Sequence, residues 1–202
     1  MNIICFDLEG VLVPEIWISV AEKTGIEELR ATTRDIPDYD ELMRFRLQLT
    51  DKFDLRIADI QSVIASLRPF SGARELLDEL RKKSQLVILS DTYYEFADPL
   101  IEQLGRPTIF CHHLIIDNDG RITGYRLRQD DQKRRAVKAF HDLNFEVTAI
   151  GDSFNDTGML DEADRGIFYC PPENVSKQFP QYPITKNYTE LRAELKAEYL
   201  SI

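Results

Sequence analysis

The sequence lacks the clustered cysteines and histidines of a disulfide framework or a zinc site. Its three cysteines are odd in number and widely spaced, which fits free thiols in a reducing compartment, and we expect them in the core. The three histidines have no second histidine or carboxylate at metal-ligand spacing, so we expect them on the surface or in loops. These residues are Cys5, Cys111, Cys170, His112, His113 and His141.

Long hydrophobic runs are also missing. No apolar stretch approaches the roughly 20 residues that a helix needs to span a bilayer. Met1 leads directly into a strand-like run, without a basic, apolar and cleavable leader. We therefore expect a cytoplasmic protein with no membrane partner.

Basic residues are in the minority. The chain has 25 Lys and Arg residues against 35 Asp and Glu residues, which gives a formal net charge of -10. Nucleic acids and anionic membranes are held mainly by clusters of Lys and Arg, so this charge disfavours both as partners, although a small anion can still bind locally. A length of 202 residues allows one main domain with room for a smaller lobe and leaves the oligomeric state open.

After one N-terminal strand at residues 3–6, the chain has a long stretch without a convincing strand pattern. Apolar residues recur there at helical spacing in three segments. These segments are residues 17–24, 38–53 and 58–67. We therefore predict a helical cap domain at residues 14–68, inserted into a core domain made of residues 1–13 and 69–202.

From Gly72 onward, helix and strand patterns alternate. The predicted helices are residues 73–83, 95–104, 131–143, 155–163 and 189–199, and the predicted strands are residues 86–90, 108–111, 114–117, 121–127, 147–151 and 166–169. Asn118, Asp119 and Gly120 form a typical hairpin turn between two of these strands. Alternating elements with short right-handed crossovers form a parallel sheet that helices cover on both faces. We predict an α/β fold with a Rossmann-like three-layer core.

Polar residues stand where several of these strands end. Asp7, Ser90 and Asp152 lie at the carboxyl ends of three predicted strands. Ligands of an open parallel sheet bind in the crevice beyond these ends, so we expect the three residues to lie close together. Lys133 begins the apolar stripe of a predicted helix, so its side chain should point towards the core. Taken alone, Asp152 or Ser90 could cap a helix, and Lys133 could belong to a solvated basic face.

These residue types are the ones that phosphoryl transfer through an aspartyl phosphate requires. Asp7 and Glu9 point to the same side of an extended backbone, where they would repel each other unless a cation or a proton intervened. Oxygen ligands select Mg²⁺, and we expect Asp7, Asp152 and the backbone carbonyl of Glu9 to hold it. The Glu9 carboxyl group would protonate the departing alkoxide and later activate water. Ser90 would bond a phosphoryl oxygen, and Lys133 would neutralise developing charge.

Arg46 indicates a site for an anionic group in the predicted cap. No acidic residue lies three or four positions away, so the guanidinium has no local partner and lies beside an apolar helical face. An inward guanidinium suits bidentate capture of a substrate carboxylate. Glu15 could hold a substrate ammonium, or it could stabilise the first turn of a helix.

Four segments resemble the motifs of the haloacid dehalogenase superfamily of phosphotransferases. They are DLEG from Asp7, Ser90, Lys133, and GDSFND from Gly151 to Asp156. The resemblance covers nearly the whole chain and implies that Asp7 is the nucleophile, with Asn155 and Asp156 supporting the metal and substrate end of the site. Glu9 stands where the family usually has a second aspartate, and a longer acid could tolerate an alcohol acceptor in place of water.

Three stretches narrow the resemblance within the superfamily. VLVPEIWISVAEKTGI, PDYDELMRFRL and LSDTYYEF resemble phosphoserine phosphatases, in particular bacterial enzymes that also transfer the phosphoryl group to homoserine. The implied substrate-binding residues are Glu15, Arg46, Ser90, Asp91, Lys133 and Asn155. Two alternatives stay open: another small-metabolite or nucleotide phosphatase of the superfamily, and a non-enzymatic phospho-accepting module that resembles receiver domains.

Overall fold

The computed structural model describes residues 1–32, 35–36 and 38–199, so residues 33, 34, 37 and 200–202 of the two predicted domains lie outside the described part. Within that part, seven strands form one sheet in the order β4-β3-β2-β1-β5-β6-β7. Neighbouring strands are parallel except β3 and β4, which form the predicted hairpin. The strands are β1 (Asn2–Phe6), β2 (Gln85–Tyr93), β3 (Thr108–Ile116), β4 (Ile122–Arg126), β5 (Glu146–Gly151), β6 (Arg165–Tyr169) and β7 (Ile184–Thr185).

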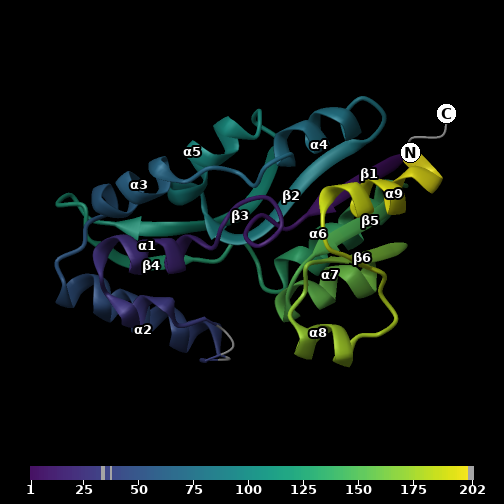
Figure 1. Ribbon diagram of the computed structural model, residues 1–202. Coiled ribbons are helices and arrows are strands. Elements are labelled where there is room, and N and C mark those ends of the chain that lie inside the picture. The colour runs from purple at the N-terminus through teal and green to yellow at the C-terminus, as the bar shows by residue number, and fades with distance from the viewer. Residues whose placement is uncertain (33–34, 37, 200–202) are drawn as a thin grey trace.

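Helices cover both faces of the sheet. In β1, Ile4 and Phe6 belong to one apolar core and Ile3 and Cys5 to the other, because successive residues of a strand point to opposite faces. The first core contains side chains of α4, α5 and α9, and the second contains side chains of α6, α7 and α8. In Figure 1, α4 and α5 lie above the sheet and α7 and α8 lie below it. These helices are α4 (Ala73–Leu80), α5 (Tyr94–Gln103), α6 (Gln132–Asp142), α7 (Thr157–Glu162), α8 (Glu173–Gln178) and α9 (Tyr188–Tyr199). The predicted α/β fold with three layers is confirmed.

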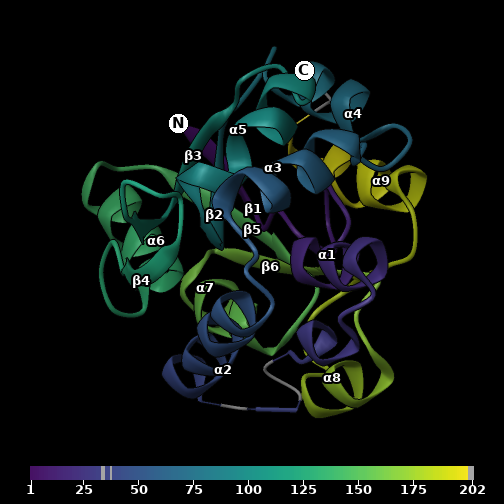
Figure 2. The same ribbon diagram turned by 90° about the vertical axis from the view of Figure 1, so that its left-hand side faces the viewer.

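The segment between β1 and α4 is helical, as predicted. It contains α1 (Ile16–Thr24), the 3-10 helix η1 (Glu27–Arg30), α2 (Tyr39–Lys52) and α3 (Ile57–Ser66). Gly25 ends α1 with a φ of 74°, a conformation that glycine adopts at no steric cost. In Figure 1, β1 runs from the N-terminus towards α1 and α2, and Figure 2 views the molecule from the side of these two helices. The helices therefore lie beyond the carboxyl end of β1.

The β3–β4 hairpin contacts the helical segment directly. The Ile57 N–H donates to Gly120 O at 2.9 Å, and the Arg121 guanidinium pairs with Asp51 at 2.8 Å. The prediction of two separate strands at 108–111 and 114–117 is wrong, because β3 is continuous. Its first half pairs with β2 and its second half with β4, so the apolar pattern breaks where the strand changes partner.

The segment between β6 and α9 holds elements that the sequence pattern did not predict. The short helix α8 and the two-residue strand β7 lie in a proline-rich stretch without clear periodicity. Tertiary contacts hold it: the Phe168 N–H donates to Pro183 O at 2.9 Å, and the Cys170 N–H donates to Thr185 O at 2.8 Å. No helix among the described residues is both long enough and apolar enough to cross a bilayer.

Candidate active site

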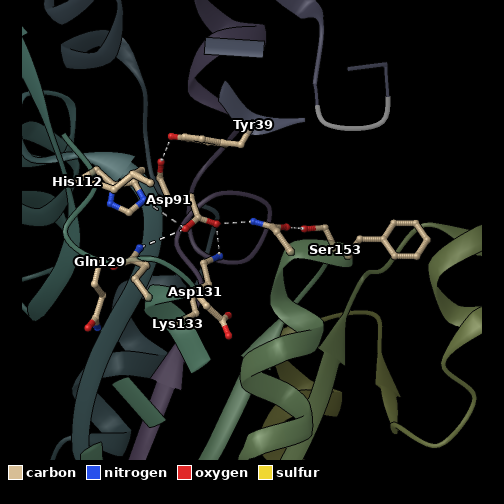
Figure 3. A pocket seen from close by; sticks show the side chains of 11 residues that line it. Tyr39, Asp91, His112, Gln129, Asp131, Lys133 and Ser153 are labelled. Carbon is tan, nitrogen blue, oxygen red and sulfur yellow. Dashed lines mark hydrogen bonds and ion pairs between the residues drawn. The ribbon is translucent and has the colours of Figure 1, made fainter. Parts of the chain in front are cut away.

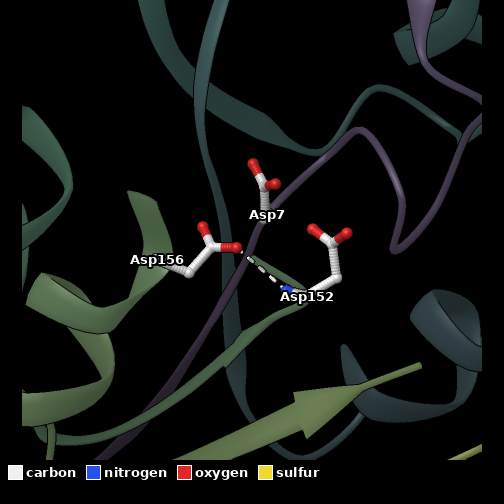
Figure 4. A group of neighbouring side chains, drawn as sticks. All are labelled: Asp7, Asp152 and Asp156. Atoms are coloured by element: carbon white, nitrogen blue, oxygen red, sulfur yellow. Dashed lines mark hydrogen bonds between the residues drawn. The ribbon is translucent and has the colours of Figure 1, made fainter. Parts of the chain in front are cut away.

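Asp7 and Asp152 lie side by side at the carboxyl ends of two neighbouring strands, β1 and β5. The Asp7 N–H donates to Ile150 O at 2.9 Å, and Asp152 follows β5, the parallel neighbour of β1 (Figure 4). Gly10 lets the loop after β1 pass close by, since its φ is 78° and a Cβ there would lie 2.5 Å from Asp152 Oδ2. The predicted convergence of these two strand ends is confirmed.

Asp156 completes a group of three buried carboxylates. One oxygen of each carboxylate lies within 4.8 Å of those of the other two, Asp7 and Asp152. Asp156 Oδ2 accepts the N–H groups of Asp152 and Ser153 at 2.9 and 3.0 Å. Gly151 gives it space, because a Cβ there would lie 2.3 Å from Asp156 Cβ. Backbone donors therefore orient Asp156, which lies at the base of the group.

Lys133 is the counter-charge of this group. Its Nζ lies 2.9 Å from Asp7 Oδ1, 2.8 Å from Asp156 Oδ1 and 3.4 Å from Asp91 Oδ2. Although burial lowers it, these carboxylates raise the pKa of Lys133 well above its usual value. Burial and the carboxylates of Asp156 and Asp152 raise the pKa of Asp7 well above its usual range, more than Lys133 lowers it. One ammonium therefore does not neutralise the group.

The acidic group fits a divalent metal ion. Carboxylate oxygens are the ligands that Mg²⁺ prefers, and the excess of buried negative charge favours a cation. The oxygens of Asp156 already accept Lys133 and backbone N–H groups, so Asp7 and Asp152 are the better side-chain ligands. Glu9 is not one of the three grouped carboxylates, and β1 ends at Phe6, before Asp7 and Glu9.

Glu9 is a half-buried acid that lines the same cavity as Asp7 and Asp152. Its Oε2 accepts the N–H of Ile16, the first residue of α1, at 2.8 Å. Burial and the nearby Glu15 carboxylate raise the pKa of Glu9 to about 8, against smaller lowering effects from Ile16, Arg46 and Thr92. A carboxyl group with this pKa carries a proton near neutral pH and can donate it.

One cavity of about 380 Å³ joins nearly all the predicted site residues. It is lined by Asp7, Glu9, Glu15, Arg46, Ser90, Asp91, Lys133, Asp152 and Asn155. Of the predicted set, only Asp156 lies outside the lining, behind Lys133. Residues from α1, α2, β2, α6 and the ends of β1 and β5 thus meet around one volume.

Arg46 reaches this cavity from α2 and is only 9% exposed. Its Nη2 donates to Ala31 O at 3.0 Å, and its Nη1 lies 3.8 Å from Met43 Sδ. Its Nε has no hydrogen-bond partner among the described residues. Burial lowers the pKa of Arg46, although the carboxylate of Glu9 opposes this effect. The predicted inward guanidinium is confirmed, and Glu15 lies at an exposed position directly before α1.

Asp91, the third carboxylate that Lys133 contacts, is surrounded by hydrogen-bond donors. It accepts hydrogen bonds from Asn155 Nδ2 at 2.9 Å and from Gln132 Nε2 at 3.2 Å, and His112 Nε2 lies 3.6 Å away (Figure 3). Burial raises its pKa, but Lys133 and these hydrogen bonds lower the pKa of Asp91 below its usual range overall. Asp91 also lines an adjoining cavity of about 560 Å³. Its carboxylate therefore stays ionised and holds Lys133.

Two expectations about individual residues are wrong. His112 is not a surface or loop residue, because it lies in β3, is 3% exposed and accepts the Arg128 N–H with Nδ1 at 3.1 Å. Cys170 is not a core residue, because it follows β6 at an exposed position and lines the 380 Å³ cavity, whereas Cys5 and Cys111 are buried as expected.

Sequence reasoning missed several residues that line the site. Trp17, Thr92 and Tyr93 face the same cavity, and Tyr39 lies between the two cavities and lines both. The Tyr39 and Tyr93 hydroxyls lie 2.7 Å apart. The helical spacing of Trp17 could have placed it on the inner face of α1, but no local pattern connects it with a residue of α2.

Comparisons with known proteins agree with this site. The chain is 57% identical to phosphoserine phosphatase ThrH of Pseudomonas aeruginosa over 100% of this chain and 99% of that protein. It is also 57% identical to a phosphoserine phosphatase of Pseudomonas syringae pv. tomato, over 96% and 82% of the two chains. A solved substrate-bound phosphoserine phosphatase complex has the same fold, with a TM-score of 0.80 and 23% identity over 97% of both chains.

A second solved structure, a phospho-aspartyl intermediate analogue of phosphoserine phosphatase, superposes with a TM-score of 0.79 and 24% identity over 97% of this chain and 98% of the other. Residues 1–164 match the hydrolase family described as haloacid dehalogenase-like hydrolase. This match contains Asp7, Ser90, Lys133 and Asp152, the residues on which the resemblance rests. The protein is an enzyme of the haloacid dehalogenase-like hydrolase family.

Proposed function

We propose that this enzyme is a Mg²⁺-dependent phosphoserine phosphatase that works through an aspartyl phosphate on Asp7. The observation that carries the proposal is the shared cavity of Asp7, Glu9 and Arg46: a nucleophile, a protonated acid and an inward guanidinium. The two Pseudomonas relatives with 57% identity, both named phosphoserine phosphatase, support the substrate.

The residues divide the first step between them. A carboxylate oxygen of Asp7 attacks phosphorus, a bond from Asp7 to phosphorus forms, and the bond from phosphorus to the serine oxygen breaks. Glu9, with its pKa near 8, gives its proton to the departing serine oxygen. Lys133 and Ser90 hold the phosphoryl oxygens as charge moves onto them. Mg²⁺ held by Asp7, Asp152 and the Glu9 carbonyl would supply the positive charge that lets two anions react.

The second step regenerates the enzyme. Glu9, now ionised, takes a proton from a water molecule, whose oxygen attacks phosphorus. The bond from Asp7 to phosphorus breaks, and inorganic phosphate leaves. Asn155 and Asp91 support Lys133 throughout, since Asn155 bonds Asp91 and Asp91 pairs with Lys133.

Arg46 and Glu15 give the site its preference for an amino-acid phosphate. The unpartnered Nε and the remaining Nη hydrogens of Arg46 suit a substrate carboxylate. Glu15, at the exposed edge of the same cavity, suits the substrate ammonium. Both residues come from residues 14–68, and we therefore assign this segment as a cap domain that brings substrate recognition to the core.

The same intermediate can transfer its phosphoryl group to homoserine. Homoserine carries the carboxylate and ammonium that Arg46 and Glu15 would recognise, and its hydroxyl would take the place of water beside Glu9. The longer side chain of Glu9, compared with aspartate, sets the proton acceptor deeper into the cavity. Transfer then requires only that homoserine outcompete water at the aspartyl phosphate.

Phosphate release from phosphoserine in the presence of Mg²⁺ tests the hydrolysis. We expect turnover by the native enzyme and none by Asp7→Asn, while Asp131→Asn, which alters an acid of the adjoining cavity, stays active. Equal rates in the native enzyme and Asp7→Asn would remove the nucleophile assignment. Homoserine added during turnover should give phosphohomoserine, and its absence would remove the transfer activity alone.

A second candidate is another small-metabolite or nucleotide phosphatase of the same family, in which Arg46 serves a different anion. Arg46→Ala separates the two. Loss of phosphoserine turnover with aryl phosphatase activity retained supports the amino-acid substrate, whereas equal loss on both substrates supports the alternative. A receiver-like module has no support, because the chain belongs to a hydrolase family and Asp7 follows the first strand.

A further inference from the structure

The hydrogen bonds of Arg46 do not by themselves explain why its guanidinium points into the cavity. Among the described residues, its two contacts within hydrogen-bond range are the neutral acceptors Ala31 O and Met43 Sδ. Burial lowers the pKa of Arg46, so the cation has lost much of its hydration. An arginine side chain also has many rotamers, which a substrate would have to order on binding. Besides the attraction of the Glu9 carboxylate, a packed group is therefore needed to fix the direction of the guanidinium before substrate arrives.

Trp17 is that group. The Arg46 Cζ lies over the Trp17 ring, 5.0 Å from its centre. Trp17 is 7% exposed and lines the same 380 Å³ cavity. An indole is the strongest aromatic partner of a cation, and the attraction grows when water is excluded from both groups. The ring thus compensates part of the hydration that Arg46 loses.

The Trp17 ring is itself held against the core. It packs edge-on against Phe96 of α5, with 5.6 Å between ring centres and 73° between planes. Phe96 is fully buried and belongs to the first apolar core. Contacts therefore run from the core helix α5 through Trp17 of α1 to Arg46 of α2. The rigid Trp17 ring, which packs against the core, therefore fixes the position of the guanidinium, and the flexible arginine side chain does not have to do so alone.

We propose that Trp17 is a positioning residue that sets the Arg46 guanidinium, and that it thereby determines the preference of the site for phosphomonoesters that carry a carboxylate. This inference rests on the proposed function, because it takes Arg46 to be the carboxylate partner. It predicts that Trp17 matters for phosphoserine but not for phosphoethanolamine, which has the phosphate and ammonium without the carboxylate.

Substitution of Trp17 tests the proposal on three substrates: phosphoserine, phosphoethanolamine and p-nitrophenyl phosphate. For Trp17→Leu we expect the KM for phosphoserine to rise by about tenfold, with kcat within about twofold of native. Turnover of the two substrates without a carboxylate should stay within about twofold. Trp17→Phe keeps a weaker aromatic face and should raise the KM for phosphoserine alone by about threefold, less than Trp17→Leu. Equal losses on all three substrates would mean a merely structural role and would overturn the proposal.

A double substitution tests whether Trp17 acts through Arg46. In the Arg46→Ala background, Trp17→Leu should cause no further loss of phosphoserine turnover, because the cation it positions is gone. A full tenfold additional loss would overturn the proposal. If Trp17→Leu does not fold, Trp17→Phe carries the test, since the weaker aromatic partner should still reduce phosphoserine affinity alone. An unchanged or uniform response of Trp17→Phe would then be decisive against it.

Fluorescence gives a readout that does not depend on turnover. Trp17 is the single tryptophan of the chain, so its emission reports on the Arg46 contact. We expect Arg46→Ala to change the emission, and phosphoserine to change it in Asp7→Asn but not in the Asp7→Asn/Arg46→Ala double variant. Identical emission of native protein and Arg46→Ala would overturn the contact. Native protein that fails to hydrolyse phosphoserine would overturn the proposed function and this inference with it, whereas native turnover with an unaffected Trp17→Leu would overturn this inference alone.

Discussion

Lys133 Nζ lies 2.9 Å from Asp7 Oδ1, and both side chains are almost completely buried. The ammonium thus touches the proposed nucleophile while Asp156 and Asp91 hold it from other sides. Because the ammonium offsets the charge of buried carboxylates and also faces the cavity, the lysine has a structural and a chemical role at once.

Lys133→Met should reduce both stability and turnover. It leaves several buried carboxylates without their counter-charge, and breaking such a buried pair typically costs about 3–5 kcal/mol. Urea unfolding at pH 7 measures the loss. Lys138→Met is the matched control, because Lys138 is largely exposed and pairs only loosely with Glu162 at 3.7 Å. A stability equal to that of the control variant would contradict the proposed role of Lys133.

Mg²⁺ should stabilise the native fold. A ligand at 100 times its dissociation constant adds about 2.7 kcal/mol, which raises the midpoint of thermal unfolding by roughly 5–10 °C in a chain of this size. Asp152→Asn should lose most of this shift, and Asp131→Asn should keep it. Thermal scans with Mg²⁺ and with a chelator make the comparison. If Mg²⁺ raised the unfolding midpoint equally in both variants, the ion would not be bound by Asp152.

Glu9→Gln should separate the two chemical steps. Phosphoserine needs a proton on its leaving oxygen, so its turnover should fall by about 10²–10⁴-fold. The p-nitrophenolate group leaves without a proton, so p-nitrophenyl phosphate should still phosphorylate Asp7. The variant should therefore release one rapid equivalent of p-nitrophenolate and then slow down, because no base activates water. A Glu9→Gln variant without this burst but with full turnover would show that another residue moves the proton.

The Asp164 carboxylate should make the free energy of unfolding depend on pH in the acidic range. The hydrogen bond from the Val147 N–H at 2.7 Å is the main cause that lowers the pKa of Asp164, and His141 at 3.0 Å adds to it. Because the folded pKa lies below the unfolded value, this contribution is present above about pH 4 and is lost as the pH falls through the folded pKa.

Asp164→Asn should therefore lower the free energy of unfolding at pH 7 by about 0.5–1 kcal/mol, a small value because the side chain is half exposed. The difference from the native protein should shrink at pH 3. Urea unfolding at both pH values measures it, with Asp142→Asn at an exposed position as the control. A difference that grows on acidification would have the wrong sign.

Local patterns predicted the parts of this protein that depend on neighbours in sequence. The alternation of helix and strand patterns anticipated a sheet covered on both faces, and the apolar stripe of α6 correctly pointed Lys133 inward. The polar residues at the predicted strand ends placed Asp7 and Asp152 together at the carboxyl end of the sheet. Arg46 was recognised from the absence of an acid one helical turn away, and it is buried as expected.

The predictions that the structure shows to be wrong concern residues whose neighbours are distant in sequence. His112 looked like a loop residue because its strand changes partner there, and Cys170 looked like a core residue because cysteines usually are. In each case the side chain's surroundings come from elements that are distant in sequence.

The sequence by itself determined the chemistry available: the order of strands and helices, the acids at strand ends, and a lysine and an arginine that face inward. Only the tertiary structure decided how these groups behave. The carboxylates shared by Lys133 and the indole over Arg46 arise between segments far apart in the chain, and the pKa of Glu9 near 8 arises mainly from burial. Electrostatic effects depend on distance in space and on exclusion of water, and neither can be read from spacing along the chain.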